Sequence, residues 1–104
     1  MKQIKNGKIY DTEQSEQIAH YNNGLSKRDF GYIRETLYRT ENGNFFIVGK
    51  GGAKTGYSKS VEGGRSGGSK LIAKDESEVI QWLDQRDIDI DEVDFDFTEL
   101  VEEA

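Results

Sequence analysis

Residues 33–49 read IRETLYRTENGNFFIVG and contain two runs rich in β-branched and aromatic side chains, 33–40 and 45–48. Asn42-Gly43 lies between the runs, and this dipeptide favours a two-residue type I′ turn because Asn tolerates a positive φ and Gly adopts it freely. The stretch therefore predicts a β-hairpin. A turn centred on Asn42-Gly43 would pair Thr40 with Phe45, Arg39 with Phe46, Tyr38 with Ile47 and Leu37 with Val48.

Both faces of this predicted hairpin carry apolar side chains. A strand pair that is apolar on both faces is typical of a sheet packed on both sides, or of a sheet that keeps one face for a partner. The hairpin is therefore expected to be the structural centre of the chain, although it indicates no chemistry. With the predicted turn, one face holds Thr36, Tyr38, Phe45 and Ile47, and the other holds Ile33, Leu37, Phe46 and Val48.

Composition limits the class of protein. A chain of 104 residues is expected to form one domain with a modest core, and 34% hydrophobic against 33% charged residues indicates that part of it is solvated. The absence of cysteine excludes disulfides, thiolate metal sites and thiol nucleophiles. No apolar run approaches the roughly 20 residues of a membrane span, and no signal-peptide core follows the initial Met-Lys. A soluble, cytoplasmic protein is expected.

Charge is divided along the chain. Residues 1–74 hold 13 basic and 7 acidic side chains, a balance of +6, whereas residues 75–104 hold Arg86 as their one basic residue and 13 acids, a balance of −12. The two balances give the net charge of −6. Such a division indicates internal neutralisation, a solvated tail, or electrostatic steering toward a basic partner.

A second Asn-Gly hairpin is predicted near the N-terminus. With Asn6-Gly7 as its turn, Ile4 pairs with Ile9 and the flanking lysines face each other at the solvated end. A two-stranded ribbon this short is not stable alone. It is therefore expected to pack against the central sheet or to extend it.

Two helices are also predicted. The first begins at the N-cap Asp11 and runs to about Asn22, and the second opens with the capping box Asp75/Glu78 and runs to about Arg86. Each has an apolar stripe with helical spacing, as expected for a helix that packs on a sheet. The stripes are Ile18, Ala19 and Tyr21 in the first helix, and Val79, Ile80, Trp82 and Leu83 in the second.

Residues 49–68 hold eight of the twelve glycines and read as a loop. Bare backbone N–H groups beside basic side chains suit a phosphate. The ending of a P-loop is absent, however, because Gly56 is followed by Tyr57 and not by Lys. Three interpretations stay open: a mobile loop anchored by Tyr57 and Val61, an anion or nucleic-acid contact, and a protein-recognition loop. The candidate anion-binding residues are Lys50, Lys54, Lys59 and Arg65.

Acidic and apolar residues alternate in the C-terminal segment, residues 87–104. The alternation fits a strand, whereas the apolar spacing from about Asp91 onward and the helix-forming residues near the end favour a helix. In either form the carboxylates are expected to point outward while Phe95 and Phe97 anchor the segment. The candidate partner-binding residues are Phe95, Phe97 and an aspartate row of Asp87, Asp89, Asp91, Asp94 and Asp96.

Clustered carboxylates suggest three roles. General acid–base catalysis requires one acid in a dry pocket, and the sequence indicates no such pocket. A calcium loop requires Gly at its sixth and Glu at its twelfth position, where a loop starting at Asp87 has Glu92 and Thr98. The single histidine, His20, lacks the converging groups that catalysis or metal binding requires. The third role, imitation of the phosphate charge of a nucleic acid, requires only density of negative charge. No catalytic residue, metal or cofactor is predicted.

The run ETLYRTENGNFFIVGKGG at 35–52, the glycine-rich loop and the later DESEVIQWL at 75–83 resemble small proteins of phages and conjugative elements in Gram-positive bacteria. The resemblance covers about residues 30–86 and does not include the acidic tail after Arg86. In size and charge, small acidic proteins from such elements resemble inhibitors of host defence, including anti-CRISPR proteins that bind Cas nucleases. The resemblance therefore implies a protein partner in the bacterial cytoplasm.

The sequence as a whole predicts an α+β fold, in which a small antiparallel sheet of two Asn-Gly hairpins and the strand Lys70–Ala73 is packed by two helices. Residues 1–86 form the expected domain and residues 87–104 the acidic segment. The expected function is non-enzymatic inhibition of a host defence nuclease, through contact of the aspartate row with a basic nucleic-acid-binding groove. The alternative is a phosphate- or nucleotide-binding module that uses loop 49–68. Direct nucleic-acid binding by the basic body is a third, disfavoured interpretation, and no membrane contact is expected.

Overall fold

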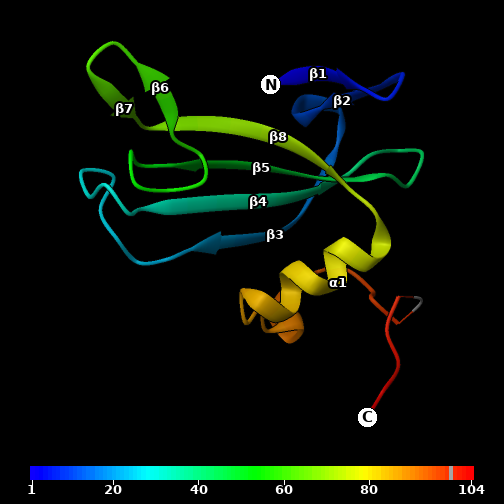
Figure 1. Ribbon diagram of the computed structural model, residues 1–104. Coiled ribbons are helices and arrows are strands. Elements are labelled where there is room, and N and C mark those ends of the chain that lie inside the picture. Colours follow the sequence, from blue (N-terminus) through cyan, green and yellow to red (C-terminus); the bar gives the residue numbers. More distant parts are fainter. Residues whose placement is uncertain (99) are drawn as a thin grey trace.

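A four-stranded antiparallel sheet lies at the centre of the molecule (Figure 1). The structure, a computed structural model, describes residues 1–98 and 100–104. Neighbouring strands in the chain are also neighbours in the sheet, except that β8 returns to pair with β5 after the small hairpin. In spatial order the strands are β3 (Glu16–Asn22), β4 (Ile33–Arg39), β5 (Phe45–Gly51) and β8 (Gly68–Lys74).

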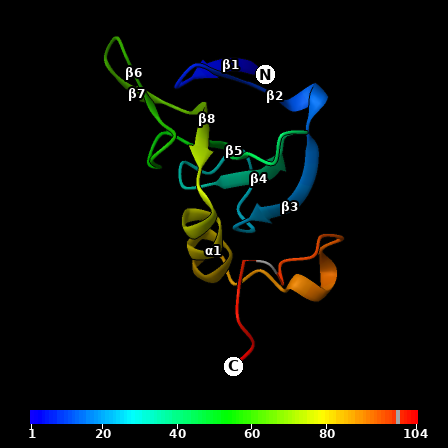
Figure 2. The same ribbon diagram turned by 90° about the vertical axis from the view of Figure 1, so that its right-hand side faces the viewer.

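Smaller elements cover both faces of this sheet. One face carries the helix and the C-terminal segment, and the opposite face carries the N-terminal hairpin, as Figures 1 and 2 show together. A second small hairpin precedes β8. These elements are β1 (Lys2–Lys5) with β2 (Lys8–Asp11), β6 (Lys59–Val61) with β7 (Gly64–Ser66), α1 (Glu76–Gln85), and two 3-10 turns, Thr12–Gln14 and Ile90–Glu92.

The central hairpin is confirmed, but its register differs by one residue from the prediction. Leu37 pairs with Ile47, and Tyr38 pairs with Phe46. The loop is longer than a two-residue turn, because the backbone N–H of Gly43 donates to the carbonyl of Thr40 at 2.9 Å and Gly43 alone has a positive φ, +84°, within residues 40–44. This is the three-residue hairpin loop that ends in a left-handed glycine.

The shift in register decides which side chains share a face, since a slip of one residue exchanges the two faces of a strand. The expected packing on both faces is confirmed, with different members in each core. The core under α1 contains Ile18, Ala19, Leu37, Phe45, Ile47, Val79, Trp82, Leu83 and Phe97. The core under the N-terminal hairpin contains Tyr10, Tyr38, Phe46 and Leu71.

The first predicted helix is wrong. Asp11 does act as an N-cap and accepts the backbone N–H of Glu13 at 3.0 Å, but the helix it caps is only the 3-10 turn Thr12–Gln14, and β3 follows. A β-bulge between Gln17 and Ala19 buries the consecutive residues Ile18 and Ala19. Two adjacent buried residues do not fit the alternation of a regular strand, and in the sequence they were interpreted as part of a helical stripe.

The predicted α+β class with two packing helices is therefore also wrong. The described chain is mostly sheet and has one α-helix, α1, beside its 3-10 turns. The segment expected to form the first helix, from Asp11 to about Asn22, lies in the sheet as edge strand β3, next to β4. The physical reason is tertiary: pairing with β4 satisfies the backbone of residues 16–22 and buries Ile18 and Ala19 in the core, whereas a short helix with a narrow apolar stripe is marginal by itself.

Other expectations are confirmed. The Asn6-Gly7 turn has positive φ at both residues, 52° and 76°, and pairs Ile4 with Ile9. The hairpin packs on the sheet through Tyr10, whose ring lies edge-on to Phe46 at 5.3 Å. Helix α1 begins with the predicted capping box and buries Val79, Trp82 and Leu83.

Candidate functional site

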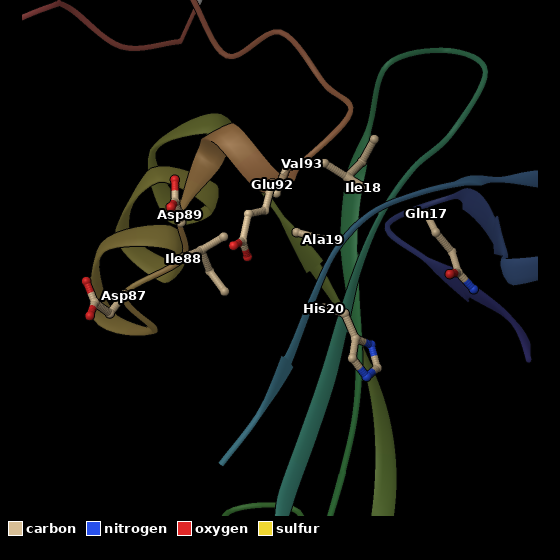
Figure 3. Close-up of a pocket in the computed structure, with 9 residues that line it drawn as sticks. All are labelled: Gln17, Ile18, Ala19, His20, Asp87, Ile88, Asp89, Glu92 and Val93. Carbon is tan, nitrogen blue, oxygen red and sulfur yellow. The ribbon is translucent and has the colours of Figure 1, made fainter. Parts of the chain in front are cut away.

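The C-terminal segment and edge strand β3 enclose a hollow of about 460 Å³, here called the acidic groove. Asp87, Asp89 and Glu92 line it on one side, and Gln17 and His20 line it on the other. Figure 3 shows the Glu92 carboxylate pointing into the space between the two segments and Asp87 at the outer rim. The groove therefore brings part of the aspartate row beside an exposed sheet edge.

A defined turn at the end of α1 directs the chain into this groove. The backbone N–H of Ile88 donates to the carbonyl of Leu83 at 3.0 Å, and that of Asp87 donates to Asp84 at 3.1 Å, which is the Schellman pattern. Asp87 takes the left-handed position with φ of 52°, where glycine is more usual. Ile88 and Leu83 both pack in the core under α1, so the turn places Ile88 inward and leaves Asp87 exposed.

Further along the segment, two aspartates stabilise the backbone themselves. Asp89 accepts the N–H of Asp91 at 3.0 Å and caps the 3-10 turn, and Asp96 accepts the N–H of Thr98 at 2.9 Å. The hydrogen bond from the Thr98 backbone is the largest cause of a lowered pKa of Asp96. The two side chains therefore form local turns that fix their own positions.

Two aromatic side chains hold the segment on the sheet. Phe97 is 3% exposed, and the rings of Phe95 and Phe97 contact at a centroid distance of 4.8 Å. Phe95 also lies edge-on to Phe45 at 6.0 Å, and the Arg39 guanidinium lies over the Phe95 ring at 5.8 Å. Phe95 and Phe97 are two residues apart and share one side of the segment, as in an extended chain and not in a helix. The helix expected from about Asp91 onward is absent from the described residues.

All five members of the aspartate row are exposed. None of them lies within ion-pair distance of a Lys or Arg in the described chain, where the ion pairs are Lys2–Asp11, Lys74–Glu78 and Arg86–Glu35. Phe97, in contrast, is buried in the protein's own core, so its part is to position the row and not to contact a partner. The segment thus presents uncompensated negative charge on a packed base.

A buried carboxylate explains why Arg86 does not neutralise the row. Glu35 is 5% exposed and accepts hydrogen bonds from Trp82 Nε1 at 2.9 Å, from Arg86 Nε at 2.7 Å and from the Tyr57 hydroxyl. Burial raises the pKa of Glu35. The hydrogen bonds from Arg86, Tyr57 and Trp82, together with the Arg86 charge, lower the pKa by more than burial raises it, so the net shift is downward. The one basic residue of 75–104 is thereby used inside the fold.

Sequence reasoning missed this cluster. Two features of the sequence could have indicated the cluster. Arg86 is the single basic residue of 75–104, and Glu35 lies on the same strand face as the apolar residue Leu37. The guanidinium of Arg86 also lies over the ring of Tyr21 at 4.5 Å. The cluster joins β3, β4, α1 and the loop before β6. Because every Glu35 contact is a donor from the protein itself, its role is structural.

The four candidate anion-binding residues of loop 49–68 do not form one site. Lys50 and Lys59 line one hollow together with Ser58, whose hydroxyl accepts two hydrogen bonds from the Arg65 guanidinium. Lys54 is exposed in a separate turn. The predicted loop is also partly regular, since it includes the end of β5 and the β6–β7 hairpin.

The expected anchors of this loop differ in outcome. Tyr57 is 7% exposed and crosses directly over Gly49, where a Cβ would lie 2.1 Å from the phenol ring. Val61 is 45% exposed and anchors nothing. Gly49 is therefore required for close approach of a ring, and not for approach of a phosphate.

Comparison with protein-family models, with curated proteins and with solved structures finds no match to this chain. In the part of the chain that the structure describes, no group of three or more His, Asp or Glu side chains is placed to hold a metal ion. The helices described there are too short or too polar to cross a bilayer. The acidic groove and the aspartate row are therefore the candidate functional site of this chain.

Proposed function

We propose that this protein is a non-enzymatic inhibitor that binds a basic, nucleic-acid-binding surface of a host defence nuclease through its aspartate row. One observation carries the proposal: five exposed carboxylates without ion-pair partners in the described chain lie on a segment that Phe97 fixes to the core. A row matched to the protein's own lysines would have no charge to offer a partner. The resemblance to mobile-element proteins suggests a Cas nuclease and the bacterial cytoplasm.

Carboxylates held in fixed positions bind a partner's Lys and Arg side chains more tightly, because little conformational entropy is lost in ordering them on binding. Capping by Asp89 and Asp96 and the packing of Ile88 and Phe97 remove much of that ordering cost beforehand. Duplex DNA presents one negative charge per ~1.7 Å of axis, and a closely spaced aspartate row competes for the same cations. Inhibition by occupation of the groove then needs no reaction.

The acidic groove suits a long cationic side chain of the partner. Ile18 and Val93 line the groove beside the Glu92 carboxylate. Lys and Arg bury their aliphatic stems on apolar surface while the charged group meets an acid. The groove thus favours entry of one such side chain while the rest of the row contacts neighbouring cations.

Replacement of the whole aspartate row by asparagine tests the proposal. Asparagine keeps the side-chain oxygens that cap the local turns, so the fold is expected to persist, whereas truncation after Arg86 would remove the buried Phe97. Binding to a purified Cas nuclease from a Gram-positive host is measured by biolayer interferometry at about 50 and about 200 mM salt. The wild type should weaken roughly tenfold or more between these, and the variant should bind roughly 100-fold more weakly at low salt.

A second variant serves as the control for charge alone. Replacement of exposed acids elsewhere by glutamine should leave affinity within about twofold, because those acids lie outside the segment. Guide RNA or target DNA bound in the nuclease groove should compete with the wild type. Equal affinity of the asparagine variant and the wild type would refute the role of the row. The control residues are Glu13, Glu16, Glu41 and Glu62.

A further inference from the structure

A second hollow, of about 350 Å³, lies on the sheet face that the N-terminal hairpin partly covers. Here it is called the basic hollow. Arg34, Thr36, Lys50 and Ser69 line it from three adjacent strands, with His20 from the edge strand. No carboxylate is among its lining residues. The hollow therefore has the opposite electrostatic character to the acidic groove.

The two cations of this hollow face each other without compensation. Arg34 and Lys50 are direct cross-strand partners in the β4–β5 register, and like charges in that position destabilise a sheet. Neither forms an ion pair in the described chain. A sheet that placed these residues for stability alone would have an acid at one of the two positions. The pair indicates that an anion from outside completes the arrangement.

Arg34 gives a second, independent indication. Its Nη1 is buried and has no hydrogen-bond acceptor among the described residues, while the guanidinium lies over the Tyr32 ring at 5.5 Å. An unsatisfied buried donor is costly, and more so when it is charged. The Tyr32 ring restrains the position of the guanidinium, whose planar shape suits paired hydrogen bonds to an oxyanion.

Hydroxyl groups complete the lining. Thr36 Oγ1 lies 2.8 Å from His20 Nδ1. Ser69 pairs with Lys50 in the β5–β8 register and lines the same hollow. Tyr38 and Val48 supply apolar surface. A hollow of this size with few polar groups on an apolar base is within the range for small-molecule sites.

We propose that the basic hollow binds the phosphate group of a small phosphorylated molecule of about the size of a nucleoside monophosphate. Arg34 and Lys50 supply the charge, and Ser69 and Thr36 supply hydroxyl donors. The site differs from the predicted one in loop 49–68, from which it takes Gly49 and, of the four candidate anion-binding residues, Lys50 alone. Its lining residues on β4, β5 and β8 lie on the sheet face opposite α1, whereas the aspartate row lies on the α1 side. His20 on the edge strand lines both hollows, so the variants that test the two sites leave His20 unchanged.

Isothermal titration calorimetry of the full chain tests this proposal, with inorganic phosphate, adenosine monophosphate and adenosine as probes at constant ionic strength. Phosphate should bind, the monophosphate should bind more tightly, and adenosine should not bind. Arg34→Gln and Lys50→Gln should each raise the Kd at least about tenfold. The control Lys5→Gln, an exposed lysine outside the hollow, should leave the Kd unchanged.

Thermal unfolding gives a second readout, first without any ligand and then with phosphate. Without phosphate, Arg34→Gln and Lys50→Gln should melt at or above the wild-type temperature, because each removes an unpaired charge. Phosphate should raise the melting temperature of the wild type and not of these variants. The proposal is overturned if phosphate and the monophosphate give no binding heat, if adenosine binds as tightly as its monophosphate, or if both variants keep wild-type affinity.

Discussion

Glu35 shows how a single carboxylate organises the space between the sheet and α1. A buried charge is tolerated only when its hydrogen-bonding capacity is filled, and here Tyr57, Trp82 and Arg86 fill it from three different parts of the chain. Burial and the adjacent Glu35 carboxylate raise the pKa of the Tyr57 hydroxyl, which therefore stays protonated and donates to Glu35. The cluster therefore fixes the loop before β6 and the end of α1 in one step.

Glu35→Gln should lower the free energy of unfolding by about 3 kcal/mol, because it leaves the Arg86 guanidinium without its carboxylate and forces the amide to face donors. Urea unfolding followed by Trp82 fluorescence measures the change. Glu41→Gln, at an exposed position of the hairpin loop, is the matched control and should shift stability by less than about 0.5 kcal/mol. A variant as stable as the control would show that the cluster contributes little.

The same substitution should change the pH dependence of stability. The pKa of Glu35 is lowered in the fold, so the unfolded chain binds more protons in the acid range and stability rises with pH there. The contribution of Glu35 is complete above the unfolded pKa of about 4.3 and is lost as the pH falls through the lower folded value. Melting temperatures between about pH 7 and pH 3 should therefore converge for the wild type and Glu35→Gln. Parallel curves would contradict this assignment.

Gly49, the first residue of the glycine-rich stretch 49–68, allows the Tyr57 ring to pack directly on strand β5. Gly49→Ala should destabilise the protein by about 2 kcal/mol, because a Cβ there overlaps the Tyr57 ring and moves its hydroxyl away from Glu35. Circular dichroism during heating measures the loss. Gly56→Ala is the control, since no atom lies within 4 Å of its added Cβ, and should have little effect. Equal melting temperatures would show that the loop moves aside at no cost.

Element by element, the sequence predicts hairpins better than it predicts their registers. The same Asn-Gly dipeptide forms a two-residue turn at Asn6-Gly7 and part of a three-residue loop at Gly43. The dipeptide permits both, and the packing of Leu37 with Ile47 under α1 selects between them. Strand β3 was missed for a related reason, because a bulge gives its buried residues a spacing that resembles a helix.

For the candidate site, alternation of acidic with apolar residues predicts aspartates that point outward, and all five aspartates are exposed. The Glu35–Arg86 pair was not predicted, since the two residues are 51 positions apart and no local pattern connects them. The pairing of Arg34 with Lys50 was also missed, because it depends on the register of β4 and β5, which the sequence did not predict. Long-range pairing is thus the part of the site that a single sequence does not specify.

At the scale of the whole molecule, one thin sheet separates two cores that share β5. Phe46 and Ile47 are adjacent in that strand and face opposite ways, so neither core persists without the strand that carries both. The two hollows differ in the sign of their lining charges, and the acidic groove lies on the α1 side of the sheet while the basic hollow lies on the other side. A chain organised in this way is expected to unfold in a single cooperative transition.

Tyr10→Ala tests that cooperativity from the core farthest from the single tryptophan. Tyr10 is 6% exposed against Phe46, and its truncation should cost about 3 kcal/mol. Because the cores share β5, Trp82 fluorescence and far-UV circular dichroism should shift to the same lower urea midpoint, although Trp82 lies on the other face. Ile9→Ala, at a 61% exposed position of the same hairpin, should leave both midpoints nearly unchanged. A Trp82 midpoint that stays at the wild-type value while the dichroism shifts would show that the hairpin and its core unfold independently of the α1 side.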